Sequence, residues 1–340
     1  MSPTLVSAAA RPRVPRLGFL GVGWIGRHRL RAIAASGAAE VAAVADQTAE
    51  AAEQASREVG RCRSLSSLDE LLALDLDGLV IATPSALHAE QAAAALERGV
   101  AVFCQKPLGR DAVEAQRVVD AARRAGRLLG VDLSYRHVAG MPEVRRLVAA
   151  GELGHIYAAR LAFHNAYGPD KPWFYDARLS GGGCVMDLGI HLVDLALWVL
   201  GFPPVARVSS SLRSGGQELR GREEGRVEDY AAAQLELGNG TSVQLACSWH
   251  LPAGQDCVIE ASFFGTRGGA SLRNLDGSFY DFTVERLTGT RRETLASAPD
   301  AWGGRAAVAW ARALAAGAGY DPAIESIVEV QATLDRIYRP

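Results

Sequence analysis

LGFLGVGWIG, residues 17–26, joins a short apolar run to a glycine-rich turn. Residues 17–20 predict a buried β-strand, and the turn has the spacing Gly21-x-Gly23-x-x-Gly26. In this pattern the first glycine permits a tight turn, the second lets a ligand approach the backbone, and the third allows close packing of helix on sheet. The stretch therefore predicts a strand, a turn and a helix whose N-terminus faces the phosphates of a dinucleotide.

The rest of the first half continues this alternation of strands and helices. Further strand-like runs lie at residues 41–45, 78–82, 100–104 and 128–133, separated by Ala-rich helical segments. Ser66 or Ser67, and Asp111, are placed to cap helix N-termini. This rhythm predicts right-handed β-α-β crossovers and an α/β fold with a doubly wound parallel sheet.

After residue 135 the pattern predicts a different kind of domain. A helix is expected at about residues 142–150, a strand at 156–163, and a buried helix after Gly181-Gly182-Gly183. Strand-like runs then follow near residues 205–212, 227–237, 242–249 and 257–264, and residues 214–225 predict a polar hairpin or lid. The second domain is therefore expected to be α+β, built on an open, mostly antiparallel sheet.

Composition limits the classes of partner. A formal net charge of -2 gives no broad attraction for nucleic acid or for an anionic membrane, so small molecules are the expected partners. The five cysteines include no Cys-x-x-Cys pair, which indicates neither a disulfide framework nor a common zinc site; we expect no metal, and reduced thiols in the cytoplasm. The most apolar window, residues 184–202, is interrupted by Asp187, His191 and Asp194, which favours a buried helix over a membrane span.

Side chains near the carboxyl ends of the predicted strands indicate a cofactor site. Asp46 ends the strand that follows the glycine turn, where a carboxylate binds the adenosine ribose hydroxyls and repels a 2′-phosphate, so NAD is favoured over NADP. His88, a few residues into the helix expected after residues 82–85, either contacts the ribose or caps local backbone. The expected cofactor-binding residues are Gly21, Gly23, Trp24, Ile25, Gly26, Asp46, Ala82, Thr83, Pro84, His88, Gln105 and Lys106.

Two segments indicate a reacting centre. Lys106 follows a strand at the same carboxyl edge and precedes a proline that stiffens the turn. Asp187, His191 and Asp194 share one face of an otherwise apolar helix, and buried ionisable groups need either a structural network or a reaction site to satisfy them. Removing a hydride from a secondary alcohol requires a base for the hydroxyl proton, and histidine suits that role near neutral pH. His191 is the candidate, with Asp187 orienting it or holding a substrate hydroxyl.

Together these residues resemble the glucose-fructose oxidoreductase, inositol dehydrogenase and rhizopine catabolism (Gfo/Idh/MocA) oxidoreductases. The resemblance rests on the glycine turn, Ala82-Thr83-Pro84 with His88, Lys106-Pro107, Tyr135-Arg136, residues 151–154, Trp173 and residues 181–194. It implies a Rossmann domain followed by an open-faced sheet domain, packed sheet to sheet in homodimers or homotetramers. It also implies a catalytic site of Lys106, Asp187 and His191 beside the nicotinamide.

The expected division of the chain follows from the pattern and the resemblance together. Residues 1–15 lack the layout of a signal peptide and are expected to be a disordered tail, and residues 16–135 are the NAD-binding Rossmann domain. Residues 136–321 are expected to bind substrate and to form the oligomer. Residues 322–340 are expected to form a helix that packs back on the first domain.

One departure from the family pattern leaves the proton's route open. Members usually carry Glu-Lys-Pro, whereas this chain has Gln105 before Lys106. Loss of that carboxylate lets Lys106 deprotonate more readily or leaves it held only by hydrogen bonds. Either Lys106 is the base and His191 a substrate binder, or the reverse.

The resemblance implies a substrate that is a sugar, a cyclitol or a derivative such as an aminosugar or aminoglycoside. The expected substrate-binding residues are Tyr135, Asn165, Tyr167, Trp173, Asp187 and His191. The predicted activity is reversible NAD-dependent oxidation of a secondary hydroxyl to a ketone. Two alternatives remain: an NAD-assisted glycosidase that uses transient oxidation, and an NAD-sensing protein without catalysis.

Overall fold

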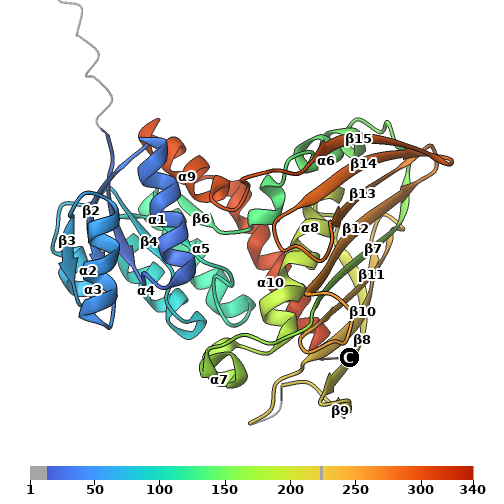
Figure 1. Ribbon diagram of the computed structural model, residues 1–340, viewed down its shortest axis with the longest axis horizontal. Coiled ribbons are helices and arrows are strands. Elements are labelled where there is room, and N and C mark those ends of the chain that lie inside the picture. The colour runs from blue at the N-terminus through green and yellow to red at the C-terminus, as the bar shows by residue number, and fades with distance from the viewer. Residues whose placement is uncertain (1–13, 223–224, 340) are drawn as a thin grey trace, which may run out of the picture.

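The computed structural model describes residues 14–222 and 225–339, and within them the chain forms two sheets, each covered by helices (Figure 1). Most of the predicted tail lies outside the described residues, which begin at Val14. The two sheets lie at opposite ends of the molecule, with helices between them. The predicted fold class, a doubly wound parallel sheet followed by an open, mostly antiparallel one, is confirmed.

The first sheet has the strand order β3-β2-β1-β4-β5-β6, and its described pairs are all parallel. Its strands are β1 (Arg16–Leu20), β2 (Glu40–Ala45), β3 (Arg63–Leu65), β4 (Gly78–Ile81), β5 (Ala101–Cys104) and β6 (Leu129–Val131). The sequence pattern predicts all of them except β3, which is three residues long and mostly polar. Because the strands are parallel, their carboxyl ends meet at one edge, where α/β sheets bind ligands.

Helices cover both faces of this sheet. They are α1 (Trp24–Ser36), α2 (Ala49–Glu58), α3 (Leu68–Leu72), α4 (Ser85–Glu97) and α5 (Ala112–Ala125). The predicted capping is confirmed, with Ser67 chosen over Ser66: the Ser67 hydroxyl accepts from the N–H of Glu70, and the Asp111 carboxylate accepts from the N–H of Glu114.

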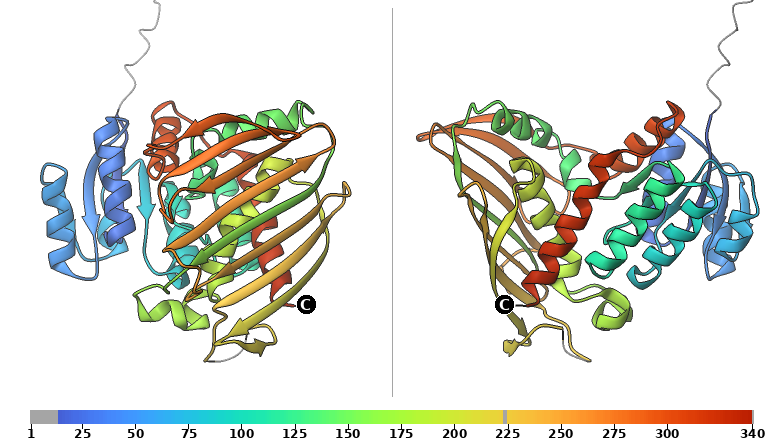
Figure 2. Two further views of the ribbon diagram at one scale, coloured as in Figure 1. Left: turned by 45° about the vertical axis from the view of Figure 1, so that its right-hand side comes forward. Right: turned by 180° about the vertical axis from the view of Figure 1, so that it is seen from behind.

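The second sheet has the order β15-β14-β13-β12-β7-β11-β10-β8-β9. Its strands are β7 (Ile156–Asn165), β8 (Val205–Ser214), β9 (Gln217–Leu219), β10 (Tyr230–Leu237), β11 (Ser242–Ser248), β12 (Cys257–Gly265), β13 (Gly269–Asn274), β14 (Phe282–Thr288) and β15 (Arg291–Ser297). Neighbours are antiparallel except β7 and β11. One face is covered by helices, and the other is open (Figure 2).

Several elements escape the sequence prediction. Strands β13 to β15 are not among the predicted strands, and they carry one, two and three charged residues, respectively. Helix α9 (Arg305–Ala315) lies in the range expected to belong to the second domain, yet it packs on the first sheet. Its Trp310 ring lies 5.7 Å from the ring of Phe103 in β5, and Gly78 and Gly130 leave room for that ring.

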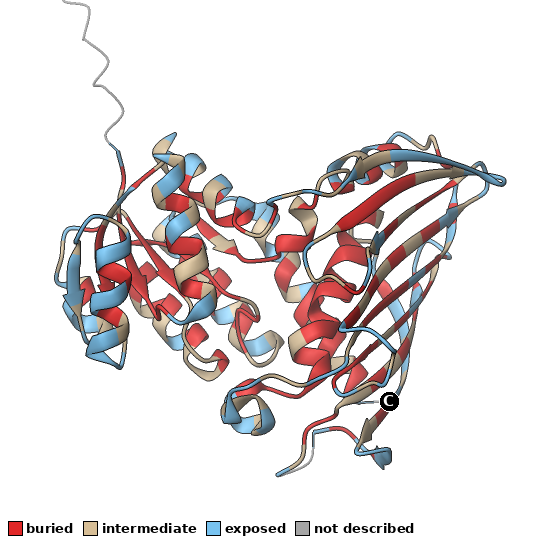
Figure 3. Cartoon of the chain, viewed as in Figure 1, coloured by how far each residue is buried: buried red, intermediate tan, exposed pale blue. Residues whose placement is uncertain are grey.

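The helices between the sheets form much of the buried core (Figure 3). They include α6 (Met141–Ala149), a π-helical turn η3 (Val185–Gly189), α8 (Ile190–Leu200) and α10 (Ser326–Ile337). The segment Ala177–Leu200 is apolar enough to cross a membrane, but 83% of its most apolar window is buried inside the fold, as in a core helix. Helix α10 contacts α5 of the first half and α8 of the second.

Candidate active site

A cavity of about 550 Å³ lies between the carboxyl edge of the first sheet and the start of α8. Many of the predicted site residues line it, although they come from distant parts of the sequence. Those residues are Gly23, Trp24, Ile25, Ala82, Thr83, Pro84, His88, Gln105, Lys106, Tyr135, Trp173, Asp187 and His191. The residues predicted from the ends of parallel strands and those predicted from the helix pattern therefore line the same cavity.

The glycine turn has the geometry that each of its glycines suggests. Gly21 has a φ of 84°, and a Cβ there would lie 2.6 Å from the carbonyl oxygen of Ala82. A Cβ on Gly26 would collide with the carbonyl of Gly21, whereas one on Gly23 would meet nothing within 4 Å. Gly23 is the N-cap residue of α1 and makes no side-chain hydrogen bond to the N–H groups of the first turn. The turn thus leaves open the space and the donors that a pyrophosphate needs.

Asp46 and His88 support the loops around this turn. Asp46 lies outside the cavity lining, and its Oδ2 accepts the N–H of Val22 at 2.9 Å. His88 is fully buried, with Nδ1 at 2.6 Å from the carbonyl oxygen of Pro107 and Nε2 at 2.7 Å from that of Thr83. Burial lowers the pKa of His88. Of the two predicted roles for His88, the contacts agree with the one in which it holds local backbone.

Lys106 and Asp187, which both line the cavity, form an ion pair. Nζ of Lys106 donates to Oδ1 of Asp187 at 2.7 Å and to its carbonyl oxygen at 2.6 Å. The other carboxylate oxygen accepts from Nε1 of Trp249 at 3.1 Å. The ammonium of Lys106 therefore has a carboxylate partner, Asp187, even though residue 105 is a glutamine and not a glutamate.

His191 lies on the same wall with its ring between aromatic side chains. The ring centroids of Tyr135 and Phe163 are 4.9 Å and 6.3 Å away. Among the described residues none makes a hydrogen bond to either ring nitrogen of His191. Burial, followed by the positive charges of Lys106 and Arg29, holds the pKa of His191 well below its ordinary value. The ring is therefore a neutral imidazole that faces the cavity with unused hydrogen-bonding capacity.

Asp194 does not join this wall, although the helical spacing predicts a shared face. Its carboxylate is buried in an ion pair with Arg136, whose Nε lies 2.9 Å away, and it is not part of the cavity lining. Burial raises the pKa of Asp194, and Arg136 opposes that shift. His191 and Asp194 both lie in α8, so the spacing between them is the predicted one, and what separates their roles is the pairing of Asp194 with Arg136. Asp194 is thus satisfied by a structural pair.

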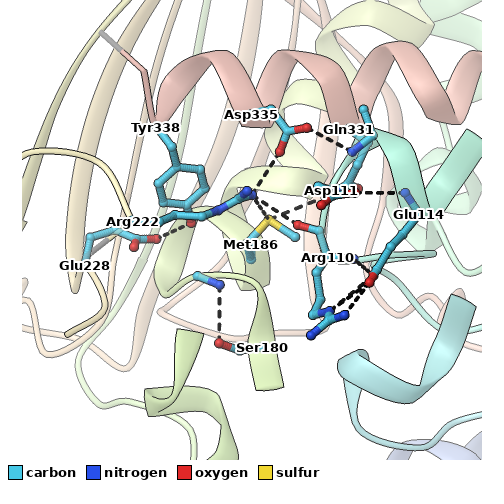
Figure 4. Close-up of polar contacts among 12 residues, drawn as sticks. Arg110, Asp111, Glu114, Ser180, Met186, Arg222, Glu228, Gln331, Asp335 and Tyr338 are labelled. Carbon is cyan, nitrogen blue, oxygen red and sulfur yellow. Dashed lines mark hydrogen bonds and ion pairs between the residues drawn. The ribbon is translucent and has the colours of Figure 1, made fainter. Parts of the chain in front are cut away.

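The glycines before η3 make room for protein side chains as well as for the cavity. A Cβ on Gly182 would collide with the hydroxyl of Tyr338, and one on Gly183 with the carbonyl of Glu228. Oε1 of Glu228 accepts the N–H groups of Gly183 and Val185, each at 2.9 Å. It also accepts the Tyr338 hydroxyl at 2.7 Å (Figure 4). Burial raises the pKa of Glu228. The turn that carries Asp187 is therefore anchored by a buried carboxylate.

A cluster of contacts around Arg222 connects α10 to the turn η3 (Figure 4). The Arg222 guanidinium donates to Asp335 of α10 at 2.9 Å and to the carbonyl of Arg110 at 3.1 Å, and it lies 4.4 Å from the centre of the Tyr338 ring. It also approaches the sulfur of Met186, which is next to Asp187 in η3. Elements from both halves of the chain thus converge behind the cavity.

Two predicted substrate residues are not brought to this cavity. Asn165 ends β7, and its side-chain oxygen is buried with no hydrogen-bond partner among the described residues. Tyr167 is half exposed, and its ring lies 6.1 Å from that of Phe279, which does line the cavity. Trp173 is in place and stacks on Phe174 with 3.8 Å between ring centroids.

The structure adds a buried polar group that the sequence reading misses. Asp132 follows β6, lines the cavity, and accepts hydrogen bonds from Nε of Arg29 and from the amide of Gln105. The rule that selects Ala82 and Lys106, a polar or turn residue at the carboxyl end of a parallel strand, applies equally to Asp132. The lining also includes Phe279, Tyr280 and Trp302 from the second half, for which the sequence gives no such signal.

Two segments of the chain match models of known protein families. Residues 15–133 match the oxidoreductase family with an NAD-binding Rossmann fold, and residues 141–271 match the GFO/IDH/MocA C-terminal domain. D-glucoside 3-dehydrogenase of Escherichia coli (strain K12) is 32% identical over 211 residues, which are 59% of this chain and 60% of that protein's length. The rhizopine catabolism protein MocA of Rhizobium meliloti is 32% identical over 262 residues, covering 76% of this chain and 78% of MocA.

A solved structure agrees with both matches. The structure of GenD2 from gentamicin A biosynthesis, in complex with NAD, superposes with a TM-score of 0.80 at 26% sequence identity, covering 98% of this chain and 96% of GenD2. The likeness therefore spans both sheets and not the first alone. The chain belongs to the GFO/IDH/MocA family of oxidoreductases, with the NAD-binding Rossmann fold and the C-terminal domain of that family.

Proposed function

We propose that this protein is an NAD-dependent dehydrogenase that oxidises a secondary hydroxyl of a sugar, a cyclitol or an aminosugar to a ketone. The observation that carries the proposal is that the Lys106–Asp187 ion pair and the neutral ring of His191 line one cavity. That cavity also contains the open side of the glycine turn at Gly23. These observations support a site in which a bound dinucleotide and a proton-accepting side chain meet.

The residues present fit a nicotinamide dinucleotide. The turn from Gly21 to Gly26 offers space and N–H donors for the pyrophosphate, and Thr83 and Pro84 line the path toward Lys106. NAD⁺, when bound, would accept the hydride from the substrate carbon. Asp46, at the end of β2, favours NAD over NADP because its carboxylate repels a 2′-phosphate.

His191 is the group that we assign to the substrate's hydroxyl proton. A neutral imidazole has a lone pair to accept that proton, and the ring nitrogens of His191 make no hydrogen bond to the described residues. Lys106 is placed to donate a hydrogen bond to the substrate oxygen, and Asp187 orients its ammonium. We assign the role of base to His191 and not to Lys106, because the ammonium of Lys106 already serves as a hydrogen-bond donor.

The flat faces of Tyr135 and Trp173 support a ring-shaped substrate. The names of two relatives, D-glucoside 3-dehydrogenase and the rhizopine catabolism protein, point to sugar-like or cyclitol-like rings, and GenD2 points to aminoglycosides. Aminosugars and aminoglycosides are therefore the finer part of the proposal.

The proposal also includes the setting of the enzyme. We place it in the cytoplasm, because its five cysteines are free and reducing conditions preserve thiols. The second sheet has a groove lined by small side chains such as Ser209, Ser211 and Ala246 and by polar ones such as Arg160 and Gln234, and its face away from the helices is open, which suits sheet-to-sheet packing in a homodimer or homotetramer. Sedimentation of the purified protein tests this assembly.

The test of activity is a screen of cyclitols, aldoses, aminosugars and aminoglycosides with NAD and NADP, followed by absorbance of the reduced nucleotide. We expect NAD reduction with at least one ring polyol. Release of free sugar from a glycoside without NADH accumulation would instead identify an NAD-assisted glycosidase. A protein that binds NAD and turns over none of these compounds would contradict the proposal in favour of an NAD-sensing role.

A further inference from the structure

Lysine is rare in this chain, and both of its lysines line the cavity. Of the 36 Lys and Arg residues in the sequence, two are lysines, Lys106 and Lys171, and the others are arginines. The basic residues in the lining of the cavity are Arg29, Lys106 and Lys171. Lysine is therefore concentrated at the proposed site. The proposed reaction gives Lys106 a role, and it leaves Lys171 without one.

Elsewhere the chain uses arginine for its positive charges, including those in exposed ion pairs. Arg57, for example, pairs with Glu53 at 2.8 Å on the surface of α2. Lys171 also lies in an exposed pair, with Nζ at 3.1 Å from Oδ2 of Asp170. A guanidinium makes such a pair at least as well, because its planar fork of donors matches a carboxylate. The pair with Asp170 therefore does not account for a lysine at this position.

The pair with Asp170 also leaves most of the ammonium's hydrogen-bonding capacity unused. The two side chains are 64% and 80% exposed, and solvent weakens the attraction within so exposed a pair. An ammonium carries three N–H donors, of which a single contact with Asp170 uses one. Lys171 thus lines the cavity with donors that a ligand can take.

Two prolines restrict the backbone that carries this ammonium. Pro169 and Pro172 flank the pair Asp170-Lys171, and each proline fixes its own φ. Pro172 also holds the residue before it in an extended conformation, as the φ of -94° and the ψ of 128° at Lys171 show. The hydroxyl of Tyr175 donates to the carbonyl of Pro169 at 3.0 Å and closes the segment. A restricted backbone lowers the cost of ordering Lys171 on a ligand.

The position of Lys171 favours a contact with the substrate over one with the dinucleotide. Lys171 lies two residues before Trp173, the proposed platform for the substrate ring, and both line the cavity. This segment belongs to the second half of the chain, whereas the glycine turn that fits the pyrophosphate belongs to the first. An ammonium beside a carboxylate also suits a polyol, because a hydroxyl can accept from one and donate to the other.

We propose that Lys171 is a specificity-determining residue whose ammonium donates a hydrogen bond to a substrate hydroxyl away from the carbon that is oxidised. Asp170 accepts from a neighbouring hydroxyl. The inference rests on the proposed function in taking a ring polyol as the substrate, and it adds that the ring carries free hydroxyls beyond the reacting centre. Arginine does not replace Lys171, because a rigid planar fork of donors cannot turn to meet a hydroxyl as an ammonium can.

The first test uses the scarcity of lysine. Lysine labelled with ¹³C at Cε gives two side-chain signals in nuclear magnetic resonance, and Lys171→Arg assigns them. The protein is titrated with NADH, and then with myo-inositol, D-glucose, D-glucosamine and kanamycin in turn, because NADH prevents oxidation of the ring. We expect at least one of the four polyols to move the Lys171 signal, and NADH alone to leave it in place.

Two other outcomes of this titration separate the sources of error. If a polyol moves the Lys106 signal and leaves that of Lys171 unchanged, or if NADH alone moves the Lys171 signal and no polyol moves it further, the inference is wrong. If neither NADH nor any of the polyols moves either signal, the proposed function is wrong, and the inference is lost with it.

The second test is kinetic and uses the polyol that moves the Lys171 signal. Lys171→Met should raise the KM for this polyol at least about tenfold with kcat changed less than about twofold, because the lost bond lies away from the reacting carbon. Lys171→Arg should also raise KM. Arg57→Lys is the matched control, since it exchanges the same residue types in an exposed ion pair outside the cavity lining, and it should keep the wild-type KM. A wild-type KM in both Lys171 variants overturns the inference.

Discussion

Nζ of Lys106 lies 2.7 Å from Oδ1 of Asp187, so the two halves of the chain meet in one ion pair. Lys106 follows β5 of the first sheet, whereas Asp187 belongs to the turn η3 that packs beneath the second sheet. The two side chains are only 18% and 17% exposed, which limits screening of their attraction by solvent. The ion pair therefore fixes the ammonium relative to the cavity and joins the first half of the chain to the second.

Lys106→Met should leave the nucleotide in place and slow the chemistry. The substitution keeps an unbranched side chain but removes the donor that stabilises charge on the substrate oxygen. We expect kcat to fall at least about a hundredfold, the usual effect of removing one such donor. The dissociation constant for NAD⁺, measured by fluorescence titration, should change far less. A variant that binds NAD⁺ and oxidises its substrate at the wild-type rate would show that Lys106 has no part in the step.

His191 should titrate below the ordinary range for histidine. Burial, and then the charges of Lys106 and Arg29, lower its pKa, so the ring stays neutral as the pH falls through 6.5 and is protonated only in more acidic solution. Activity that depends on a neutral His191 should therefore persist at pH 6.5. Because Lys106 is one of the causes, Lys106→Met should raise the pKa of His191 toward its ordinary value.

Nuclear magnetic resonance of ¹³C-labelled histidine rings measures both values directly, and a His191→Asn sample assigns the signal. The comparison needs no substrate, so it remains informative if the activity screen fails. A His191 signal that titrates near 6.5 in the wild-type protein, or one that Lys106→Met does not shift, would contradict the electrostatic account of this ring.

The parts of the site that depend on local rules were predictable from the sequence. The glycine turn and Lys106 follow from strand ends in a parallel sheet, and Asp187 and His191 follow from their closeness on one helical segment. For Asp194 the sequence leaves open a structural network or a reaction site, and the ion pair with Arg136 is the structural alternative, which no sequence signal marks in advance. Local periodicity carries no information about such long-range pairs.

The parts that depend on distant contacts were not predictable. Arg29 and Asp132 are 103 positions apart, and nothing in either neighbourhood announces their ion pair. Strand β15 is mostly exposed and begins with three charged residues, so its pairing with β14 at the edge of the sheet defines it. Helix α9 returns to the first sheet because Trp310 has a site there between Gly78 and Gly130, which appears only once the sheet is assembled.

Asp46→Asn should change the choice of nucleotide without loosening the turn. Oδ2 of Asp46 accepts the N–H of Val22, and an asparagine oxygen can do the same. Removing the negative charge removes repulsion of a 2′-phosphate, so the ratio of NADP to NAD affinity should rise at least about tenfold. Titrations with both nucleotides measure it. Asp46→Ala is the matched comparison: it also loses the bond to Val22 and should weaken both nucleotides. An unchanged ratio in Asp46→Asn would refute this role.

Gly182 and Tyr338 should be energetically coupled. Gly182 has a φ of 156°, and a Cβ there would collide with the Tyr338 hydroxyl and lie 2.9 Å from Cγ of Met186. That hydroxyl donates to Glu228, which holds the backbone of Gly183 and Val185 just before Asp187. A side chain at position 182 therefore disturbs both the packing of α10 and the turn that presents the catalytic candidate.

Gly182→Ala should destabilise the protein by about 1–3 kcal/mol, the usual cost of overpacking a buried position. Tyr338→Phe should cost about 1–3 kcal/mol, because Glu228 loses a hydrogen bond inside the core. The double variant should be more stable than the sum of the two losses predicts, by about 0.5 kcal/mol or more, since removing the hydroxyl removes part of the collision. Urea denaturation of the four proteins measures the coupling. Strict additivity would mean that Gly182 is required for its backbone conformation alone and that the close approach of Tyr338 is incidental.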